Sequence, residues 1–385
     1  MRRYVYTGLS LLVASVLLFA MGCGQKAIQK ESELDTPQYH FRQGNRLLEQ
    51  DNYSGARESF NRAKALNPNY GRAYSGHALV EAYLENYDEA MKLADQGVEK
   101  NDAKDAWTFV ARGRVKMMAK PDNWEKKAEK DFEKAAELAP NDSEVYFWWG
   151  MKKKMAYQFR GAESMFTKVI ENKDEWSKRA DKQYAIVQKI VRAAPGTMVG
   201  KKIAVLEVID RADLAVLFME ELKLQEVLQK KRPKEYDTGF SAPTDYNQVP
   251  GAPAPKGDQL PSDVQNHWAK SWIKQVIDLG IMETYPDGKW YPDENMTRGE
   301  YALFLQNIVI FAFDEPDLAT KYIGENSRFK DMRSSLATYN AAALCVDRGI
   351  MTAYMDGTFK PEETVGGADA LLIIRQLQNH LRMTF

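Results

Sequence analysis

The chain holds few residues of the kinds that cross-link a fold or bind a metal. Among its 385 residues are two cysteines, Cys23 and Cys345, and four histidines. Two cysteines cannot form a disulfide framework, and no two histidines stand at the spacing of zinc ligands, so we expect no metal site. Cys345 lies between Leu344 and Val346, which predicts a buried structural thiol rather than a reactive one.

Neither sign of charge dominates, since 53 basic residues balance 54 acidic ones. A chain without a basic excess has no general attraction for nucleic acid, so we expect no nucleic-acid partner. The sequence also lacks a serine–histidine–acid set around a nucleophile elbow, a glycine-rich phosphate loop and a zinc signature. We therefore expect no enzyme, no catalytic residue and no cofactor.

The first residues predict an export signal. Met1-Arg2-Arg3 supplies positive charge, and residues 9–21 are almost wholly apolar. That run is shorter than the roughly 20 residues that cross a bilayer. A charged start, a short apolar stretch and small residues before a cleavage point are the layout of a signal peptide.

The apolar run ends in Ala20-Met21-Gly22-Cys23, which resembles the cleavage site of bacterial lipoproteins. The resemblance implies a signal peptide over residues 1–22, a lipid on Cys23 and a polar tether over residues 23–37. Gly24 after the cysteine implies an outer-membrane location, facing the periplasm. The alternative is ordinary secretion with Cys23 removed.

A period of 34 residues runs through the first half of the chain. Small residues recur where two antiparallel helices would approach closely, and phenylalanines recur where they would fill the gap to a neighbouring helix pair. The four series are Gly44, Ala56, Phe60, Ala63 and Pro68; Ala78, Ala90, Ala94, Gly97 and Asp102; Ala111, Ala128, Phe132, Ala135 and Pro140; and Gly150, Ala162, Phe166 and Val169.

These positions resemble the tetratricopeptide repeat over residues 38–174, in four units. The resemblance implies a right-handed superhelix of helical hairpins with a concave groove, lined by the first helix of each pair and open to a protein partner. For any single residue of that face, a solvated or half-packed position is the alternative. The face predicted for the groove consists of Phe41, Asn45, Arg72, Leu79, Arg112, Phe147 and Met151.

Two similar segments occupy residues 261–312 and 326–385. Tyr285-Pro286-Asp287-Gly288 recurs as Tyr354-Met355-Asp356-Gly357, at an offset of 69 residues. Each Asp-Gly pair predicts a tight turn with glycine at positive φ. The two segments resemble the S-layer homology repeat, a mostly helical unit that usually occurs as three repeats around a pseudo-threefold axis and attaches proteins to cell-wall polymer.

A divergent first repeat is expected over residues 175–230. Ile209-Asp210-Arg211-Ala212-Asp213 resembles the later motif Met296-Thr297-Arg298-Gly299-Glu300, although the tyrosine-containing turn is missing. The proline- and glycine-rich residues 231–260 would then be a linker inside the module. The alternative is that residues 175–230 cap the superhelix. In both cases the predicted fold is all-α: a superhelix of hairpins followed by a mostly helical module.

The closing motifs predict helix starts. Thr297-Arg298-Gly299-Glu300 forms a capping box, and Asp210 and Asp213 can cap a helix in the same way. Capping does not explain Arg211 and Arg298, because a cation in the first turn opposes the helix dipole. Free backbone N–H groups beside a guanidinium would suit a carboxylate. Solvent exposure or a salt bridge is the alternative for both arginines.

The tyrosines of the turns could pack against a sugar face while their hydroxyls form hydrogen bonds, although aromatic residues here could instead belong to the core. Gly366-Gly367 replaces cap and arginine in the last repeat, so we expect at most two working sites. The residues predicted to contact an anionic wall polymer are Arg211, Asp213, Trp268, Tyr285, Asp287, Arg298, Glu300, Tyr354 and Asp356.

The sequence thus predicts a non-catalytic lipoprotein of the cell envelope. It would bind peptidoglycan or an anionic secondary polysaccharide through its C-terminal module and recruit a protein through its helical repeats. The alternative is an accessory subunit of an envelope assembly or polysaccharide-export system, in which the C-terminal module is only a docking fold.

Overall fold

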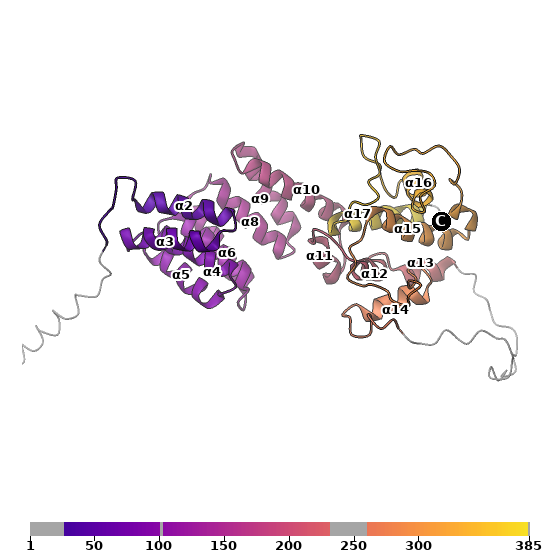
Figure 1. Cartoon of the computed structure of the whole chain (residues 1–385), viewed down its shortest axis with the longest axis horizontal. Helices are drawn as coiled ribbons and strands as arrows, with labels where there is room; N and C mark the ends of the chain where they lie inside the picture. The colour runs from indigo at the N-terminus through magenta and orange to yellow at the C-terminus, as the bar shows by residue number, and fades with distance from the viewer. Residues whose placement is uncertain (1–26, 101–102, 232–259, 384–385) are drawn as a thin grey trace, which may run out of the picture. The chain divides into compact units, whose positions relative to one another are not determined.

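The structure, a computed structural model, describes residues 27–100, 103–231 and 260–383 (Figure 1). Over these ranges the regular secondary structure is helical, and the extended pairing is limited to two isolated bridges. The predicted all-α fold is confirmed. Cys23 and nearly all of the predicted linker lie outside the described residues.

The chain divides into two compact units, Met1–Asp181 and Lys182–Phe385, which we call the N-terminal and C-terminal units. In the described ranges, no helix combines the length and the apolar character that a bilayer crossing requires.

The N-terminal unit consists of helical hairpins that follow the period of the sequence. Consecutive helices pack in pairs, and each pair packs on the next. The pairs are α2 (Pro37–Glu49) with α3 (Tyr53–Leu66), α4 (Gly71–Tyr83) with α5 (Tyr87–Lys100), α6 (Ala106–Ala119) with α7 (Trp124–Leu138), and α8 (Ser143–Met155) with α9 (Phe159–Asn172). Helix α10 (Ser177–Ala193) continues into the C-terminal unit.

Polar side chains set where several of these helices begin. In each case a side-chain oxygen accepts a hydrogen bond from a backbone N–H two or three residues ahead, which satisfies a donor that the helix leaves unpaired. The caps are Thr36 for α2, Asn52 for α3, Asp105 for α6 and Asp142 for α8.

Phenylalanines and glycines set the spacing of the helices. Phe60, Phe132 and Phe166 are fully buried. A methyl group on Gly76 would lie 2.3 Å from the Phe60 ring, and one on Gly150 would lie 2.6 Å from the Phe166 ring. The absence of a side chain therefore creates the space that each ring fills.

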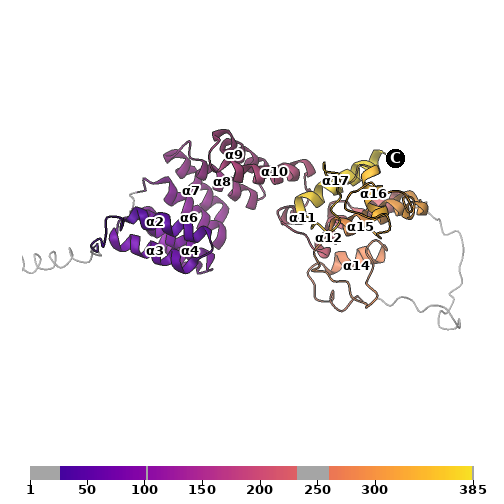
Figure 2. The ribbon, with the colours of Figure 1, turned by 45° about the horizontal axis from the view of Figure 1, so that its top comes forward.

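The C-terminal unit is built from shorter helices and long loops. Its helices are α11 (Met198–Ala204), α12 (Arg211–Glu220), α13 (Leu224–Lys231), α14 (Lys270–Asp278), α15 (Arg298–Phe313), η2 (Pro316–Ala319), α16 (Tyr339–Asp347) and α17 (Gly367–Met383). Figure 2 shows α12, α15 and α17 gathered in this unit.

Three backbone hydrogen bonds close a ring at the centre of the C-terminal unit. Met296 N donates to Ile209 O, Val365 N donates to Met296 O, and Ile209 N donates to Val365 O, each at 2.9 Å. Each of the three residues stands one or two positions before the start of α12, α15 or α17. The ring therefore gives the three helix starts equivalent places around one pseudo-threefold axis.

The third helix start differs because glycine replaces a side chain there. Gly367 stands where α15 has Arg298, and a methyl group on it would lie 1.8 Å from Ile203 O. One on Gly366 would lie 2.9 Å from Glu207 O. Since the first segment lacks the tyrosine-containing turn, the start of α17 packs directly on the end of α11.

Candidate functional site

The first tyrosine-containing turn is held by its own backbone and by Asp287. Tyr285 N donates to Lys289 O and Gly288 N donates to Tyr285 O, each at 2.9 Å, with φ of +80° at Gly288. Asp287 Oδ1 accepts from Lys289 N at 3.0 Å, and Oδ2 accepts from the Tyr291 hydroxyl. These bonds, with that from Tyr291 the strongest, hold the pKa of Asp287 below its usual value. The carboxylate therefore builds the turn.

The second turn repeats this construction. Tyr354 N donates to Thr358 O at 2.8 Å and Gly357 N donates to Tyr354 O at 2.9 Å, with φ of +84° at Gly357. Asp356 Oδ1 accepts from the backbone N–H and the hydroxyl of Thr358. The two turns thus present equivalent tyrosines, and Asp356, like Asp287, is occupied by local hydrogen bonds.

An aspartate ties each turn to the start of its own repeat. Asp263 Oδ2 accepts from Trp290 N at 3.0 Å and from Tyr291 N at 2.7 Å. Asp331 holds the second turn through the equivalent N–H groups, at 2.9 and 2.7 Å. The sequence analysis gave neither aspartate a role, although their spacing of 68 residues nearly matches that of the two turns.

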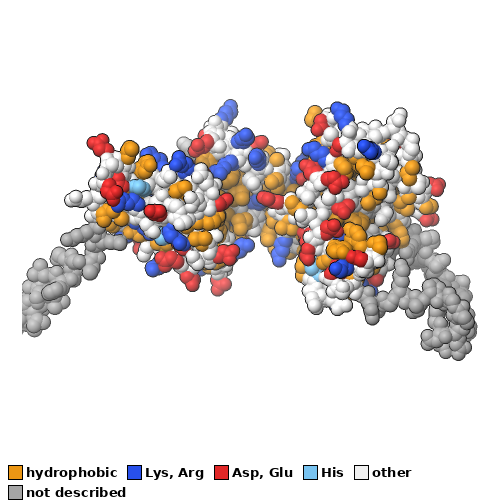
Figure 3. Space-filling model, viewed as in Figure 1, with side chains coloured by type: hydrophobic (Ala, Val, Ile, Leu, Met, Phe, Trp, Pro, Cys, Tyr) orange, Lys and Arg blue, Asp and Glu red, His pale blue; other side chains and the backbone are white. Residues whose placement is uncertain are grey.

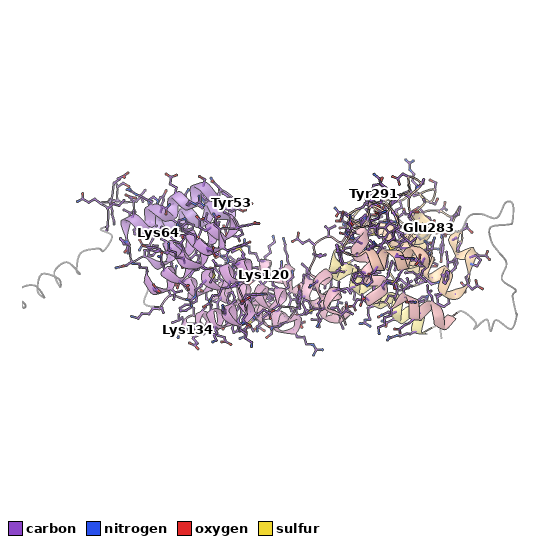
Figure 4. The ribbon with its side chains drawn as sticks, turned by 90° about the horizontal axis from the view of Figure 1, so that it is seen from below. Tyr53, Lys64, Lys120, Lys134, Glu283 and Tyr291 are labelled. Atoms are coloured by element: carbon purple, nitrogen blue, oxygen red, sulfur yellow. The ribbon has the colours of Figure 1, made fainter. Side chains whose placement is uncertain are left out.

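Arg211 reaches from the start of α12 into the first turn. Its side chain is 4% exposed, and its guanidinium lies 4.9 Å from the ring centre of Tyr285, 4.7 Å from that of Trp290 and 5.1 Å from that of Phe304. Nη2 donates to Glu283 O at 2.7 Å, whereas Nε is buried without a partner in the described residues. Burial lowers the pKa of Arg211 from its ordinary value. We call this the first arginine site (Glu283 is labelled in Figure 4).

Arg298 reaches in the same way from the start of α15 into the second turn. Nε donates to Phe359 O and Nη2 to Thr352 O, both at 2.9 Å. The guanidinium lies 5.0 Å from the ring centre of Tyr354 and 4.8 Å from that of Phe359. Its tyrosine, its second aromatic residue and its Nη2 acceptor all stand 69 residues beyond those of Arg211. This is the second arginine site, and unlike Arg211 its arginine is only half-buried.

The expectation of free backbone N–H groups beside these arginines is wrong. Arg211 N donates to Glu294 O, and Arg298 N donates to Glu363 O, both at 2.9 Å. The loop of the following repeat thus caps each helix start with its carbonyl groups. Only the side chains are open to an anion, and no carboxylate in residues 27–100, 103–231 or 260–383 forms an ion pair with either guanidinium.

The other predicted contact residues fall into two groups. Asp213 and Glu300 are occupied in the predicted capping boxes, which the structure confirms. Trp268 is 55% exposed and Tyr354 is 36% exposed, so both present a face to solvent. The Tyr285 hydroxyl donates to Glu294 Oε2 at 3.1 Å.

Lys360 adds a second cation at the second arginine site. Its Nζ lies 4.1 Å from the ring centre of Tyr354, on whose ring Arg298 also stacks. Tyr291 holds the equivalent position in the first turn. The sequence analysis missed Lys360, although its position relative to Tyr354 could have indicated it.

Asp213 gives the C-terminal unit a pH-dependent stability. Burial and the charge of Asp210 raise its pKa to about 6, with His267 acting in the opposite direction. A carboxyl whose folded-state pKa is raised stabilises the fold below its unfolded pKa of about 4, and this contribution is lost as the pH rises through about 6. We therefore expect Asp213→Asn to increase the free energy of unfolding above pH 6 and to change it little below pH 4.

Denaturant unfolding of the full chain at about pH 4 and about pH 7.5 measures this effect. Asp278→Asn, at an exposed carboxylate paired with Lys274, is the control. An Asp213→Asn variant less stable than the parent at the higher pH would contradict the assignment.

The N-terminal unit holds a pocket of about 310 Å³ that includes Tyr83, Trp107, Arg114, Glu144, Trp148 and Trp176. We call it the tryptophan pocket. The Arg114 guanidinium lies 3.8 Å from the ring centre of Trp148, and Trp107 Nε1 donates to Glu144 Oε1 at 3.2 Å. Burial raises the pKa of Glu144. The pocket thus combines aromatic faces with charges of both signs.

The groove face predicted from the sequence is largely wrong. Asn45 lines the tryptophan pocket, but Phe41, Leu79 and Phe147 are buried in the core, at 6%, 0% and 7% exposure. Phe41 packs edge-to-face on Trp107, with ring centres 4.8 Å apart. These positions pack between hairpins, so the open surface lies about one residue to one turn further along the same helices.

The remaining predicted groove residues are engaged within the fold. Arg72 pairs with Asp105 at 2.6 Å, and Arg112 pairs with Asp131 at 2.7 Å. Met151 packs on the hydrophobic core around α7. Arginines committed to internal carboxylates are poorly placed to recruit a partner.

Comparison with known families assigns both halves of the chain. The S-layer homology domain profile matches residues 262–302 and 328–371, and the tetratricopeptide repeat profile matches residues 37–70. The chain therefore combines tetratricopeptide repeat structure with two S-layer homology repeats, as predicted.

Curated relatives share part of this architecture. Cell surface glycoprotein 1 of Acetivibrio thermocellus is 29% identical over 152 residues, which is 38% of this chain and 6% of the relative. The cellulosome-anchoring protein of the same organism is 29% identical over 112 residues, which is 29% of this chain and 24% of the relative. The chain therefore spans only a small share of both relatives. A thermophilic TPR protein of Thermus thermophilus aligns with 49% of this chain and 94% of its own, at 14% identity and a TM-score of 0.35.

Proposed function

We propose that this protein is a non-catalytic attachment protein of the bacterial cell envelope. Its C-terminal unit binds an anionic cell-wall polymer, either peptidoglycan or a secondary polysaccharide, and its N-terminal unit recruits a protein. Support comes from the S-layer homology repeats, from relatives named for the cell surface and for anchoring, and from the two arginine sites.

The unpaired charge of Arg211 carries the proposal. Its guanidinium is buried, makes one hydrogen bond and leaves Nε without a partner in the described ranges. A buried cation without a counter-ion costs several kcal/mol, which a bound carboxylate would offset. Figure 3 shows basic and acidic side chains interspersed over the visible face, so attraction for an acidic polymer depends on such local sites rather than on a general field.

Residues 182–231 serve, in this proposal, as a divergent first repeat. The hydrogen-bonded ring gives Ile209 the same place as Met296 and Val365. Each arginine enters the turn of the next repeat around the ring. The third site has neither an arginine nor a receiving turn, so the module has two working sites.

Co-sedimentation with purified sacculi tests the proposal. Replacing both Arg211 and Arg298 by glutamine removes two cations, so we expect affinity to fall by at least about a hundredfold, at roughly 1–3 kcal/mol for each charge-assisted contact. Arg333→Gln, at an exposed arginine of the same unit, is the control. Undiminished retention of the double variant would exclude polymer binding at these sites and favour a role in envelope assembly.

The tryptophan pocket is the proposed site for the protein partner. Tyr83 is 41% exposed at its edge, so a photo-crosslinking residue there should capture a discrete protein in cells. The same residue at Lys134 on α7 (Figure 4), outside the pocket, should not. Equal capture at both positions would contradict the assignment.

A lipid on Cys23 completes the proposal. Acyl chains would hold the N-terminus in the outer membrane, facing the periplasm, while the C-terminal unit binds the wall. Mass spectrometry of the mature N-terminus distinguishes a lipidated Cys23 from simple cleavage after it.

A further inference from the structure

The C-terminal unit has a second polar cavity, separate from the arginine sites. It lies where α12, α13 and α14 meet, and its volume is about 270 Å³. Its lining includes Glu220, Lys223, Gln225, Glu226, Trp272 and Gln275. Neither the turns nor Arg211 and Arg298 contribute to it.

Two tryptophans form an aromatic surface at this cavity. Trp272 Nε1 donates to Glu220 Oε1 at 2.8 Å, which fixes the indole at the cavity wall. The ring centre of Trp268 lies 6.0 Å from that of Trp272, with the planes at 60°. Trp268 is 55% exposed, although its size favours burial or a bound partner. The pair therefore offers an apolar aromatic face beside polar groups.

The polar lining suits hydroxyl and amide groups rather than an anion. Gln225 and Gln275 each provide a donor and an acceptor. Glu220 and Glu226 outnumber Lys223, which itself lies 3.8 Å from Glu226. An acidic sugar would meet net negative charge here, whereas at the arginine sites it meets uncompensated cations.

We propose that this cavity binds a neutral sugar residue of a wall glycan. The apolar face of the sugar ring packs on Trp268 and Trp272, and its hydroxyl or acetamido groups bond with Gln225, Gln275 and Glu226. The inference deepens the proposed function and rests on it for the identity of the polymer. It assigns the neutral part of the chain to this cavity and the acidic part to the arginine sites.

Calorimetric titration of the mature full chain with a β-1,4-linked N-acetylglucosamine tetramer tests the inference. We expect saturable binding that Trp268→Ala and Gln275→Ala each weaken at least about tenfold. Both side chains are at the surface, so these variants should remain folded. Arg298→Gln should bind the tetramer as the parent does, and Tyr39→Ala, at an aromatic residue 42% exposed in the other unit, is the matched control.

Absence of binding at millimolar tetramer, or unchanged binding by Trp268→Ala, would overturn the inference. Loss of binding in Arg298→Gln would also overturn it, because the tetramer would then bind at an arginine site. Tetramer binding that depends on Trp268 in a protein that sacculi do not retain would uphold the cavity while contradicting the proposed anion sites.

Discussion

Gly367→Ala is expected to destabilise the C-terminal unit by about 3 kcal/mol or more, the scale of severe backbone and packing clashes. The added methyl group would lie 1.8 Å from Ile203 O, and a backbone oxygen cannot move without disturbing α11. Since α17 also contributes to the hydrogen-bonded ring, the three helix starts should separate together. Thermal unfolding of the full chain, followed by the near-ultraviolet signal of the tryptophans, measures the change.

Gly299→Ala is the matched control for this substitution. Gly299 lies in the first turn of α15, where an added methyl group would be 3.2 Å from Pro361 O and 3.3 Å from side-chain atoms, so a small adjustment suffices. We expect it to cost much less than Gly367→Ala. Equal costs for the two substitutions would contradict direct packing of α17 on α11.

Arg211→Met should separate binding from stability. Methionine keeps the aliphatic volume between Tyr285 and Trp290 and removes a buried charge that has no carboxylate partner in the described residues. Replacing buried charge by apolar volume is often neutral or stabilising. We therefore expect an unchanged or raised unfolding midpoint and at least a tenfold weaker retention by sacculi.

Arg375→Met provides the contrast. The Arg375 guanidinium donates to Ala193 O at 3.1 and 2.8 Å and to Ala194 O at 3.2 Å, at the end of α10. Its loss should reduce stability by about 1–3 kcal/mol and leave polymer binding intact in the folded protein. Strong destabilisation by Arg211→Met with no effect on retention would make Arg211 purely structural.

The repeat pattern predicted the core of the N-terminal unit but not its groove. Phe60, Phe132 and Phe166 are buried as expected, because every hairpin must fill the same gap. Which turn of the first helices faces the groove depends on how hairpins stack, and the period of the sequence does not encode this. Leu79 is therefore core, whereas Tyr83, one turn later, lines the tryptophan pocket.

In the C-terminal unit, the capping motifs predicted where α12 and α15 begin, because a capping box is local in sequence. The contacts of the arginines are not local. Arg211 N bonds to Glu294 O, and Arg298 N bonds to Glu363 O, so the following repeat occupies the donors that a single motif leaves free. The importance of Gly367 likewise appears only once α11 lies against it.

The central claim is that the C-terminal unit recognises acidic groups on a cell-wall polymer. The most direct measurement is retention of the full chain by sacculi before and after chemical removal of their pyruvyl and acetyl substituents, at fixed ionic strength. We expect strong retention that is lost when the acidic pyruvyl groups are removed and that survives removal of the neutral acetyl groups. Retention that is equal on intact and pyruvyl-free sacculi would contradict the claim.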